Sequence, residues 1–144
     1  MSGHTDRGRD GCRVPIPWTK DAAGAHGFSN DKNLKIDQAW LPQSAGWGES
    51  AADTQQGVAG SFFEMVKTAL AIRKTESGLG DGQMDWIEVS DDVIAFQRPG
   101  KFACYVNLGK SDAVIPYGSE VLLASSELKG EHIPTDTAVW LRLP

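Results

Sequence analysis

Residues 8–18 read Gly8-Arg9-Asp10-Gly11-Cys12-Arg13-Val14-Pro15-Ile16-Pro17-Trp18. The two prolines lack a backbone N–H group and push the residue before each of them towards extended conformations, so the second half of this stretch is expected to be stiff and extended. The two glycines allow tight turns on either side of the charged residues between them. The stretch is therefore predicted to be a shaped loop that holds Arg9 and Asp10 in fixed directions.

Length and composition limit the classes of protein that fit. The chain has 144 residues, the size of one domain or of a piece of a larger one. A formal net charge of -5 leaves no basic surplus to neutralise phosphates, so no nucleic-acid partner is expected. No apolar run approaches the roughly 20 residues that cross a bilayer, and the N-terminus is polar, unlike a signal peptide. We therefore expect a cytoplasmic protein with no membrane partner.

The chain contains 2 cysteines, Cys12 and Cys104, which lie far apart in the sequence. They form neither a Cys-x-x-Cys pair nor a disulfide framework, so both are expected to be free thiols. Cys12 falls on the predicted loop and should be accessible. Cys104 falls in a predicted strand whose alternation places it on one face with Phe102 and Val106, so its thiol should be buried.

Residues 1 to about 56 keep neither a helical nor a strand period for long. A loop region of this length is uncommon in a compact domain and usually indicates a functional loop or a missing partner. Its large apolar side chains are irregularly spaced and are expected to anchor the chain on a surface: Trp18, Phe28, Trp40, Leu41 and Trp47.

Residues 58–74 carry the clearest helical pattern of the chain. Apolar residues recur there at the spacing of one helical face, namely Val58, Phe62, Met65, Val66, Ala69 and Leu70. Ser61 followed by Glu64 has the form of a capping box, so the pattern allows a start either at Val58 or at Ser61. The glycines at positions 78 and 80 predict where the helical segment has ended.

Short strands with turn signals between them are predicted from residue 83 onward. The expected strands are 83–89, 92–98, 102–107, 120–125 and 137–143, with an additional edge strand at 113–115. Pro99-Gly100 predicts a hairpin between the second and third of them. This spacing is typical of an antiparallel meander or β-sandwich.

Several ordered segments resemble α-glucosidases of the α-amylase superfamily, of the oligo-1,6-glucosidase type. Residues 8–18 resemble the loop after the last barrel strand, whose pattern is Gly-Arg-Asp-Gly-x-Arg-x-Pro-x-x-Trp. The other matches follow in order along the chain: Ala25-His26-Gly27-Phe28-Ser29, Ala39-Trp40-Leu41-Pro42, the helix from Ser61 to Lys74, the strand ending in Val106-Asn107, and the closing strand from Asp136 to Leu141.

This resemblance implies an α+β fragment, in which the end of a (β/α)8 barrel, with its loop and last helix, is followed by a C-terminal antiparallel β-sandwich. It places the boundary between residues 1–78, the end of the catalytic barrel, and residues 79–144, the all-β domain. It also implies the C-terminal part of an α-glucosidase-type glycoside hydrolase acting on α-linked gluco-oligosaccharides in carbohydrate metabolism.

A retaining glycosidase needs a nucleophilic carboxylate and a carboxylic acid roughly 5 to 5.5 Å apart. The family supplies both from earlier barrel strands, and nothing in this sequence places two of its acids across a cleft. We therefore expect no catalytic residue, metal or cofactor in this chain, and no hydrolysis by the chain alone. Two alternatives stay open: a β-sandwich that acts alone as a carbohydrate-binding or interaction module, and a fragment of a related transglycosidase or isomerase.

Arg9 is the predicted substrate-binding residue. The resemblance implies that its planar, multi-donor guanidinium hydrogen-bonds the outer hydroxyls of the non-reducing glucose. From the residues alone, a pairing of Arg9 with Asp10 or another acid that only holds the loop remains open. Asp10 and Arg13 are predicted to brace the loop.

The other side chains with chemical potential have more ordinary expected roles. The histidines at positions 4, 26 and 132 are too far apart for a metal site and are expected on the surface or in loops. Trp86 and Trp140 fall in predicted strands and are expected in the core, whereas Trp18, Trp40 and Trp47 are expected nearer a cleft. An oligosaccharide is expected as a partner only when the barrel is complete. Self-association or docking is expected through the apolar face of residues 58–74.

Overall fold

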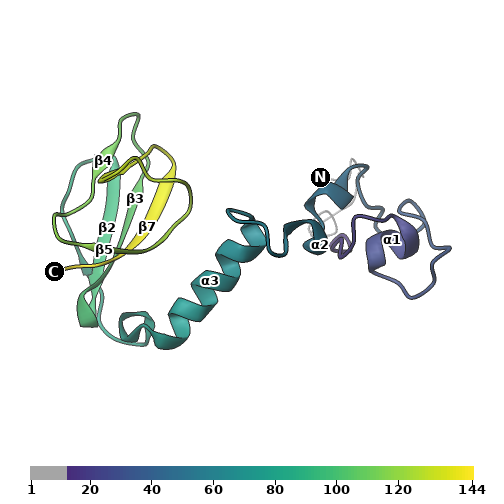
Figure 1. Cartoon of the computed structure of the whole chain (residues 1–144), viewed down its shortest axis with the longest axis horizontal. Helices are drawn as coiled ribbons and strands as arrows, with labels where there is room; N and C mark the ends of the chain where they lie inside the picture. The colour runs from purple at the N-terminus through teal and green to yellow at the C-terminus, as the bar shows by residue number, and fades with distance from the viewer. Residues whose placement is uncertain (1–12) are drawn as a thin grey trace. The chain divides into compact units, whose positions relative to one another are not determined.

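The computed structural model of the chain describes residues 13–144. The chain divides into two compact units, one that ends at Glu64 and one that begins at Met65 (Figure 1). The predicted boundary after residue 78 concerns the barrel and the β domain of the family, and it stays a prediction. In the described part of the chain, no helix is both long enough and apolar enough to cross a membrane.

The first unit contains only short elements, as the missing periodicity predicted. They are α1 (Ala23–Gly27), the 3-10 turn η2 (Trp47–Ser50) and α2 (Ala52–Gln55). No element that lies wholly within the described part of this unit has more than five residues. Its shape therefore depends on turns and tertiary contacts rather than on long helices or strands.

The predicted helix is α3 (Phe62–Thr75), and its first turn shows why it starts there. The Ser61 hydroxyl accepts a hydrogen bond from the Glu64 backbone N–H at 3.2 Å, which is the contact expected of an N-cap. Gly57 and Gly60 have φ values of 78° and 77°, which interrupt any earlier helical turn and leave Val58 outside. Of the two starts that the sequence allowed, the structure has the one at Ser61.

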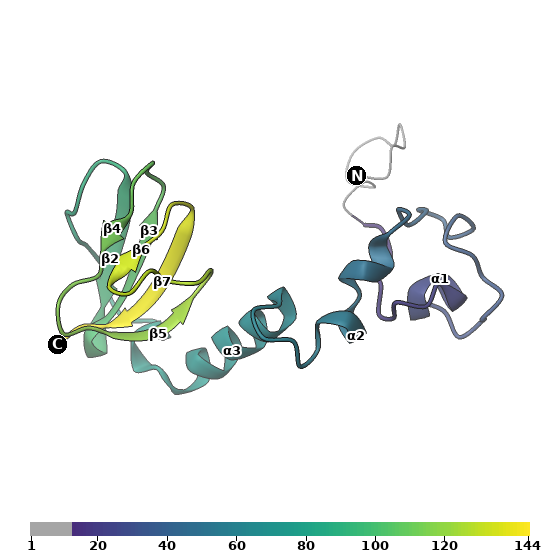
Figure 2. The same ribbon diagram turned by 45° about the horizontal axis from the view of Figure 1, so that its top comes forward.

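The second unit carries a 5-stranded sheet in the order β1-β2-β3-β7-β5 and a 2-stranded sheet of β4 and β6 (Figure 2). The strands are β1 (Asp85–Trp86), β2 (Val93–Arg98), β3 (Phe102–Asn107), β4 (Ala113–Val114), β5 (Glu120–Ala124), β6 (His132–Ile133) and β7 (Thr137–Arg142). Every pair of neighbouring strands is antiparallel. The antiparallel β domain predicted from the sequence is therefore confirmed.

The predicted hairpin at Pro99-Gly100 is confirmed, because β2 pairs with β3 from Arg98↔Phe102 onward. Gly100 has a φ of 80°, in the left-handed region where a glycine is favoured. Two of the observed strands differ from the prediction. The first is two residues long rather than seven, and β6 was not predicted, because a two-residue strand has no periodicity to detect.

One apolar core joins the two sheets. It is formed by the buried side chains of Ala95, Ala103, Tyr105, Ile115, Ile133, Val139 and Leu141. Ile133 comes from β6 and Ile115 follows β4, so the small sheet covers one face of the large one. This arrangement is the two-layer sandwich expected for residues 79–144.

The opposite face of the large sheet carries Phe102, Cys104 and Trp140. Cys104 is buried, as predicted from strand alternation, and burial raises the pKa of its thiol. The Phe102 and Trp140 rings make an edge-to-face contact with centroids 5.8 Å apart. The core position predicted for Trp86 is wrong, because its side chain is 68% exposed on β1, which is an edge strand.

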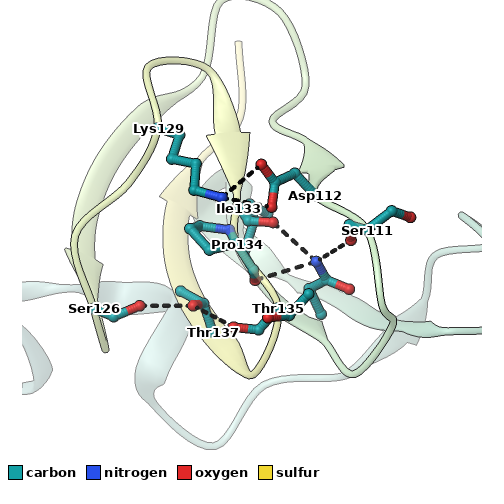
Figure 3. Close-up of polar contacts among 9 residues, drawn as sticks. Ser111, Asp112, Ser126, Lys129, Ile133, Pro134, Thr135 and Thr137 are labelled. Carbon is teal, nitrogen blue, oxygen red and sulfur yellow. Dashed lines mark hydrogen bonds and ion pairs between the residues drawn. The ribbon is translucent and has the colours of Figure 1, made fainter.

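A buried asparagine fastens β6 to the end of β3. The Asn107 side-chain N–H groups donate to the carbonyl oxygens of Ser111 and Ile133, each at 2.9 Å, and of Pro134 at 3.1 Å. Figure 3 shows these acceptors together with the neighbouring ion pair between Lys129 and Asp112, which measures 3.0 Å. The contacts tie the end of β3 to β6 and to the residues that follow β6. They explain why a polar residue ends an otherwise apolar strand.

A second polar contact joins the segment after α3 to the sheet. Glu76 is buried and lies 2.7 Å from the Arg142 guanidinium of β7, which also contacts Glu120. The hydrogen bond from Arg142 lowers the pKa of the Glu76 carboxyl from its usual value, despite the opposing effect of burial. Glu76 also accepts from the Gly78 N–H, so one carboxylate holds the turn after the helix and the last strand together.

Candidate functional site

Arg9, the predicted sugar contact, lies outside the described residues, as do Asp10, Cys12 and His4. Their predicted roles therefore remain predictions. The structure does describe the rest of the loop, from Arg13 onward.

The proline segment of the loop has no helix or strand, and three distant groups bind its carbonyl oxygens. The Gln43 side-chain amide donates to the Pro15 carbonyl at 3.0 Å. The backbone N–H groups of Ala52 and Asp53 donate to the carbonyls of Pro17 and Trp18, at 3.2 and 3.1 Å. The prolines have no N–H group to donate, and their carbonyl oxygens hold this stretch as acceptors at both of its ends.

Element α1 is a turn with left-handed backbone dihedrals rather than a regular helix. Its φ values are 65° at Gly24, 53° at Ala25, 57° at His26 and 74° at Gly27. Each non-glycine residue in this region costs about 1 to 2 kcal/mol, so the turn is strained and must be held by its surroundings. The His26 carbonyl accepts hydrogen bonds from two backbone N–H groups of the proline segment, those of Trp18 and Thr19, at 2.8 and 3.1 Å.

The side chain of His26 is buried inside the loop unit, so of the two expected places, the surface or a loop, His26 has the one in a loop. Its Nδ1 lies 3.0 Å from the Thr19 carbonyl oxygen, which can only accept, and Nδ1 therefore carries a proton. The ring lies against Gly48, where an added Cβ atom would come within 2.7 Å of His26 Cε1. His26 thus packs between two parts of the loop, at Thr19 and at Gly48, and holds them together. His132 is exposed, as predicted.

Four acidic side chains of this unit stabilise turns of the loop. Asp53 accepts from the Lys20 backbone N–H at 2.9 Å, and Glu49 pairs with the Lys20 ammonium at 3.0 Å. Asp21 and Asp31 each accept a backbone N–H two residues later, which is an Asx turn. Among residues 13–144, no group of three or more His, Cys, Asp or Glu side chains is placed to hold a metal ion. These four acids therefore stabilise the turns of the loop unit.

An open hollow of about 420 Å³ lies beside the loop and contains Arg13, Phe28 and Trp40, with Pro15, Leu34, Gln38, Ala39 and Leu41 completing its lining. The Trp40 side chain is 92% exposed. Aromatic faces and a guanidinium offer stacking surfaces and hydrogen-bond donors, the two kinds of contact that bind sugars. The sequence predicted Trp40 near a cleft. Nothing in the sequence indicated that Arg13 and Phe28 would line the same hollow as Trp40, because these residues belong to no common helix or strand pattern.

Comparison with known proteins gives relatives but no family model that matches the chain. The chain is 30% identical over 110 residues to a probable alpha-glucosidase of Rhizobium meliloti (strain 1021), a match covering 74% of this chain and 18% of that protein. It is 25% identical over 153 residues to a glucan 1,6-alpha-glucosidase of Streptococcus dysgalactiae subsp. equisimilis, covering 99% of this chain and 27% of that protein.

Solved structures show the same fold. The alpha-glucosyl transfer enzyme XgtA superposes with a TM-score of 0.68 at 28% identity, covering 96% of this chain and 27% of that one. The trehalulose synthase MutB from Pseudomonas mesoacidophila MX-45 superposes with a TM-score of 0.73 at 21% identity, covering 94% of this chain and 26% of that one. The chain thus spans about a quarter of the length of these proteins, or less.

The similarities extend over nearly the whole chain, from the loop through α3 to the β domain, and they confirm the resemblance that the ordered motifs indicated. They also agree with the observed fold, in which an irregular loop region and one long helix precede an antiparallel sandwich. The chain is a member of the α-amylase superfamily and corresponds to the C-terminal portion of its α-glucosidase-type enzymes.

Proposed function

We propose that the chain supplies the C-terminal part of an α-glucosidase-type glycoside hydrolase that acts on α-linked gluco-oligosaccharides in carbohydrate metabolism. The observation that carries this proposal is the 30% identity to a probable alpha-glucosidase over 110 residues. The glucan 1,6-alpha-glucosidase that matches 99% of the chain supports the same class of substrate. The compartment we propose is the cytoplasm.

In this proposal the loop presents Arg9 to the non-reducing glucose. The observed contacts on the proline segment and on the turn at His26 fix the chain a few residues after Arg9. A planar, multi-donor guanidinium is suited to hydrogen-bond sugar hydroxyls and so to favour the productive pose. Arg9 positions the substrate and cannot replace the nucleophile or the acid.

The chain of 144 residues is therefore expected to be inactive alone. The test incubates the purified chain with a chromogenic α-glucoside. We expect no release of the chromophore above background. Turnover that follows the protein through successive purification steps would show that the active site lies within these residues and would overturn this part of the proposal.

Activity is expected when the barrel is supplied. A chimera in which this chain replaces the matching segment of the Rhizobium meliloti relative should hydrolyse the same α-glucoside. In the chimera, Arg9→Ala should remove about 2 to 4 kcal/mol of transition-state stabilisation. This loss would lower kcat/KM roughly 30- to 1,000-fold. Lys35→Ala is the control, because Lys35 is an exposed cation of the same unit. Equal activity of the two variants would argue against a substrate contact by Arg9.

A second candidate function is glucosyl transfer rather than hydrolysis. It is favoured by the alpha-glucosyl transfer enzyme XgtA, which is 28% identical and covers 96% of this chain. Analysis of the chimera's products would separate the two functions, since hydrolysis releases glucose and transfer yields new oligosaccharides. Sugar binding by the isolated chain would instead support a stand-alone binding module.

We also propose that the apolar face of α3 docks or self-associates. None of its residues is buried, and Leu70 is 55% exposed, although the helix carries six large apolar side chains: Phe62, Phe63, Met65, Val66, Leu70 and Ile72. Exposed apolar surface of this kind usually marks an interface. The isolated chain should bind a hydrophobic dye or sediment as an oligomer. A monomer at high concentration that binds no dye would contradict this expectation.

A further inference from the structure

One hollow of the loop unit has two aromatic side chains and a cation on its lining, those of Phe28, Trp40 and Arg13. Hydrogen bonds tie its walls together. The carbonyl oxygen of Pro15, a lining residue, accepts from the Gln43 amide at 3.0 Å. The carbonyl oxygen of Leu34, another lining residue, accepts from the Ala25 N–H at 3.0 Å. The volume of about 420 Å³ lies within the usual range of small-molecule sites, and the walls are set by the fold before a ligand binds.

The chemistry of the lining favours a neutral ligand that is rich in hydroxyl groups. Trp40 and Phe28 are 92% and 56% exposed, so aromatic surface is available to stack on the apolar face of a sugar ring. Arg13 is also exposed, and within residues 13–144 no hydrogen bond or ion pair engages its guanidinium. Its planar set of donors suits sugar hydroxyls. The described lining contains no acidic side chain that would attract a cation.

In the proposed enzyme, the hollow lies on the side of the barrel that binds substrate. The loop unit connects the last barrel strand to α3, and loops that lead from a strand to a helix build the active-site face of a (β/α)8 barrel. Arg13 follows Arg9 by four residues, which span at most about 14 Å. Since Arg9 is proposed to contact the non-reducing glucose, the hollow is within reach of the next units of a bound oligosaccharide.

We propose that the hollow binds a further glucosyl unit of an α-linked oligosaccharide, on the reducing-end side of the bond that is cleaved. Trp40 stacks on this unit and Arg13 donates hydrogen bonds to its hydroxyls. The inference rests on the proposed function, because only an enzyme of that class brings such a substrate to the loop. A contact this far from the reacting bond is equally strong in the ground state and the transition state, so it lowers KM for longer substrates and leaves kcat unchanged.

The first test measures binding to the isolated chain by titration calorimetry. The probes are isomaltotriose and maltotriose, which differ in linkage. We expect Trp40→Ala and Arg13→Ala to weaken binding of the preferred trisaccharide at least fivefold. Trp40→Phe keeps an aromatic ring and should retain most of the affinity. The matched control is Tyr117→Ala, because Tyr117 is an aromatic residue of the sheet unit, 91% exposed, and should not affect binding.

The second test measures steady-state kinetics in the Rhizobium meliloti chimera. Its substrates are the preferred trisaccharide and a chromogenic monoglucoside, which has no further glucosyl unit to place in the hollow. Trp40→Ala should raise the KM for the trisaccharide at least fivefold more than the KM for the monoglucoside, with less than a twofold change in kcat for the trisaccharide. Tyr117→Ala should leave both KM values unchanged.

The two tests separate this inference from the proposed function. An active chimera whose KM for the trisaccharide does not respond to Trp40→Ala would overturn the inference and leave the proposed function standing. Sugar binding that survives both Trp40→Ala and Arg13→Ala, or no binding by the folded chain, would also overturn it. Binding that depends on Trp40 beside an inactive chimera would keep the sugar site but count against the proposed function, as expected of a stand-alone module. If the isolated chain aggregates, the KM values decide, and an aggregated chain with an inactive chimera counts against both.

Discussion

The two units of the chain are held together by different forces. In the described part of the first unit, the buried apolar residues are Ala25, Leu41 and Ala51, while large side chains such as Trp40 face outward. In the second unit the buried apolar set includes Phe102, Tyr105, Ile115, Ile133, Val139 and Leu141. The loop unit therefore depends on hydrogen bonds and on glycine positions, and the sheet unit on apolar burial.

This difference predicts how each unit responds to substitution. Removing a buried aliphatic side chain from the sheet should lower the free energy of unfolding, because the cavity left behind is not refilled. Removing an exposed aromatic side chain from the loop should change that free energy little, because no packed contact is lost. The size of the removed group should therefore matter less than its burial.

The largest effect is expected for Leu141→Ala. Leu141 is fully buried in the core between the two sheets, and its truncation should cost about 3 kcal/mol. Urea unfolding followed by circular dichroism measures the change. Trp40→Ala removes a larger side chain from the loop unit and should cost less than about 0.5 kcal/mol. A cost for Trp40→Ala as large as that for Leu141→Ala would show that the loop unit has an apolar core of its own.

The next effect is expected for Asn107→Ala. The substitution leaves the carbonyl oxygens of Ser111, Ile133 and Pro134 without their shared donor and should cost about 2 kcal/mol. The matched variant in the loop unit is Gln43→Ala, which removes a single hydrogen bond, to the Pro15 carbonyl, and should cost about 1 kcal/mol. Both values come from urea unfolding. A smaller loss for Asn107→Ala than for Gln43→Ala would contradict the greater importance of the sheet contact.

A smaller effect, dependent on pH, is expected for Glu76. Arg142 lowers the pKa of this carboxyl in the folded chain, so its contribution to stability is present above its unfolded pKa and is lost as the pH falls through the lower folded value. Glu76→Gln should cost about 1.5 kcal/mol at pH 7 and less as the pH falls into the acid range. Urea titrations at several pH values measure this convergence. A constant difference between wild type and variant would contradict it.

The sequence predicted the sheet unit better than the loop unit, for a physical reason. Strand alternation and turn residues are local signals, so the hairpin at Pro99-Gly100 and the burial of Cys104 were both predicted correctly. The exposure of Trp86 was missed because it depends on β1 being an edge strand of two residues, which is a tertiary property.

In the loop unit, the family motif indicated where a site lies but not how it is built. The burial of His26 follows from its contacts with Thr19 and Gly48, which are 7 and 22 residues away in the sequence. The left-handed dihedrals at Ala25 and His26 are disfavoured for both residue types, so no propensity predicts them. The hollow of Arg13, Phe28 and Trp40 likewise depends on loop contacts that carry no period.

The smallest effect on global stability, but the clearest local one, is expected for Gly48→Ala. An added Cβ atom would lie 2.6 Å from the Lys20 carbonyl oxygen and 2.7 Å from His26 Cε1. The His26 ring and the backbone at Lys20 must therefore shift. The amides of Trp18 and Thr19, which bond the His26 carbonyl, should then exchange their hydrogens faster, while the midpoint of unfolding of the sheet unit stays unchanged. Hydrogen exchange read by mass spectrometry measures both units in one experiment, with Ser50→Ala as the control at an exposed position of the same turn. Unchanged exchange at Trp18 and Thr19 would mean that His26 does not hold the loop, whereas faster exchange throughout β3 and β7 would mean that the two units unfold together.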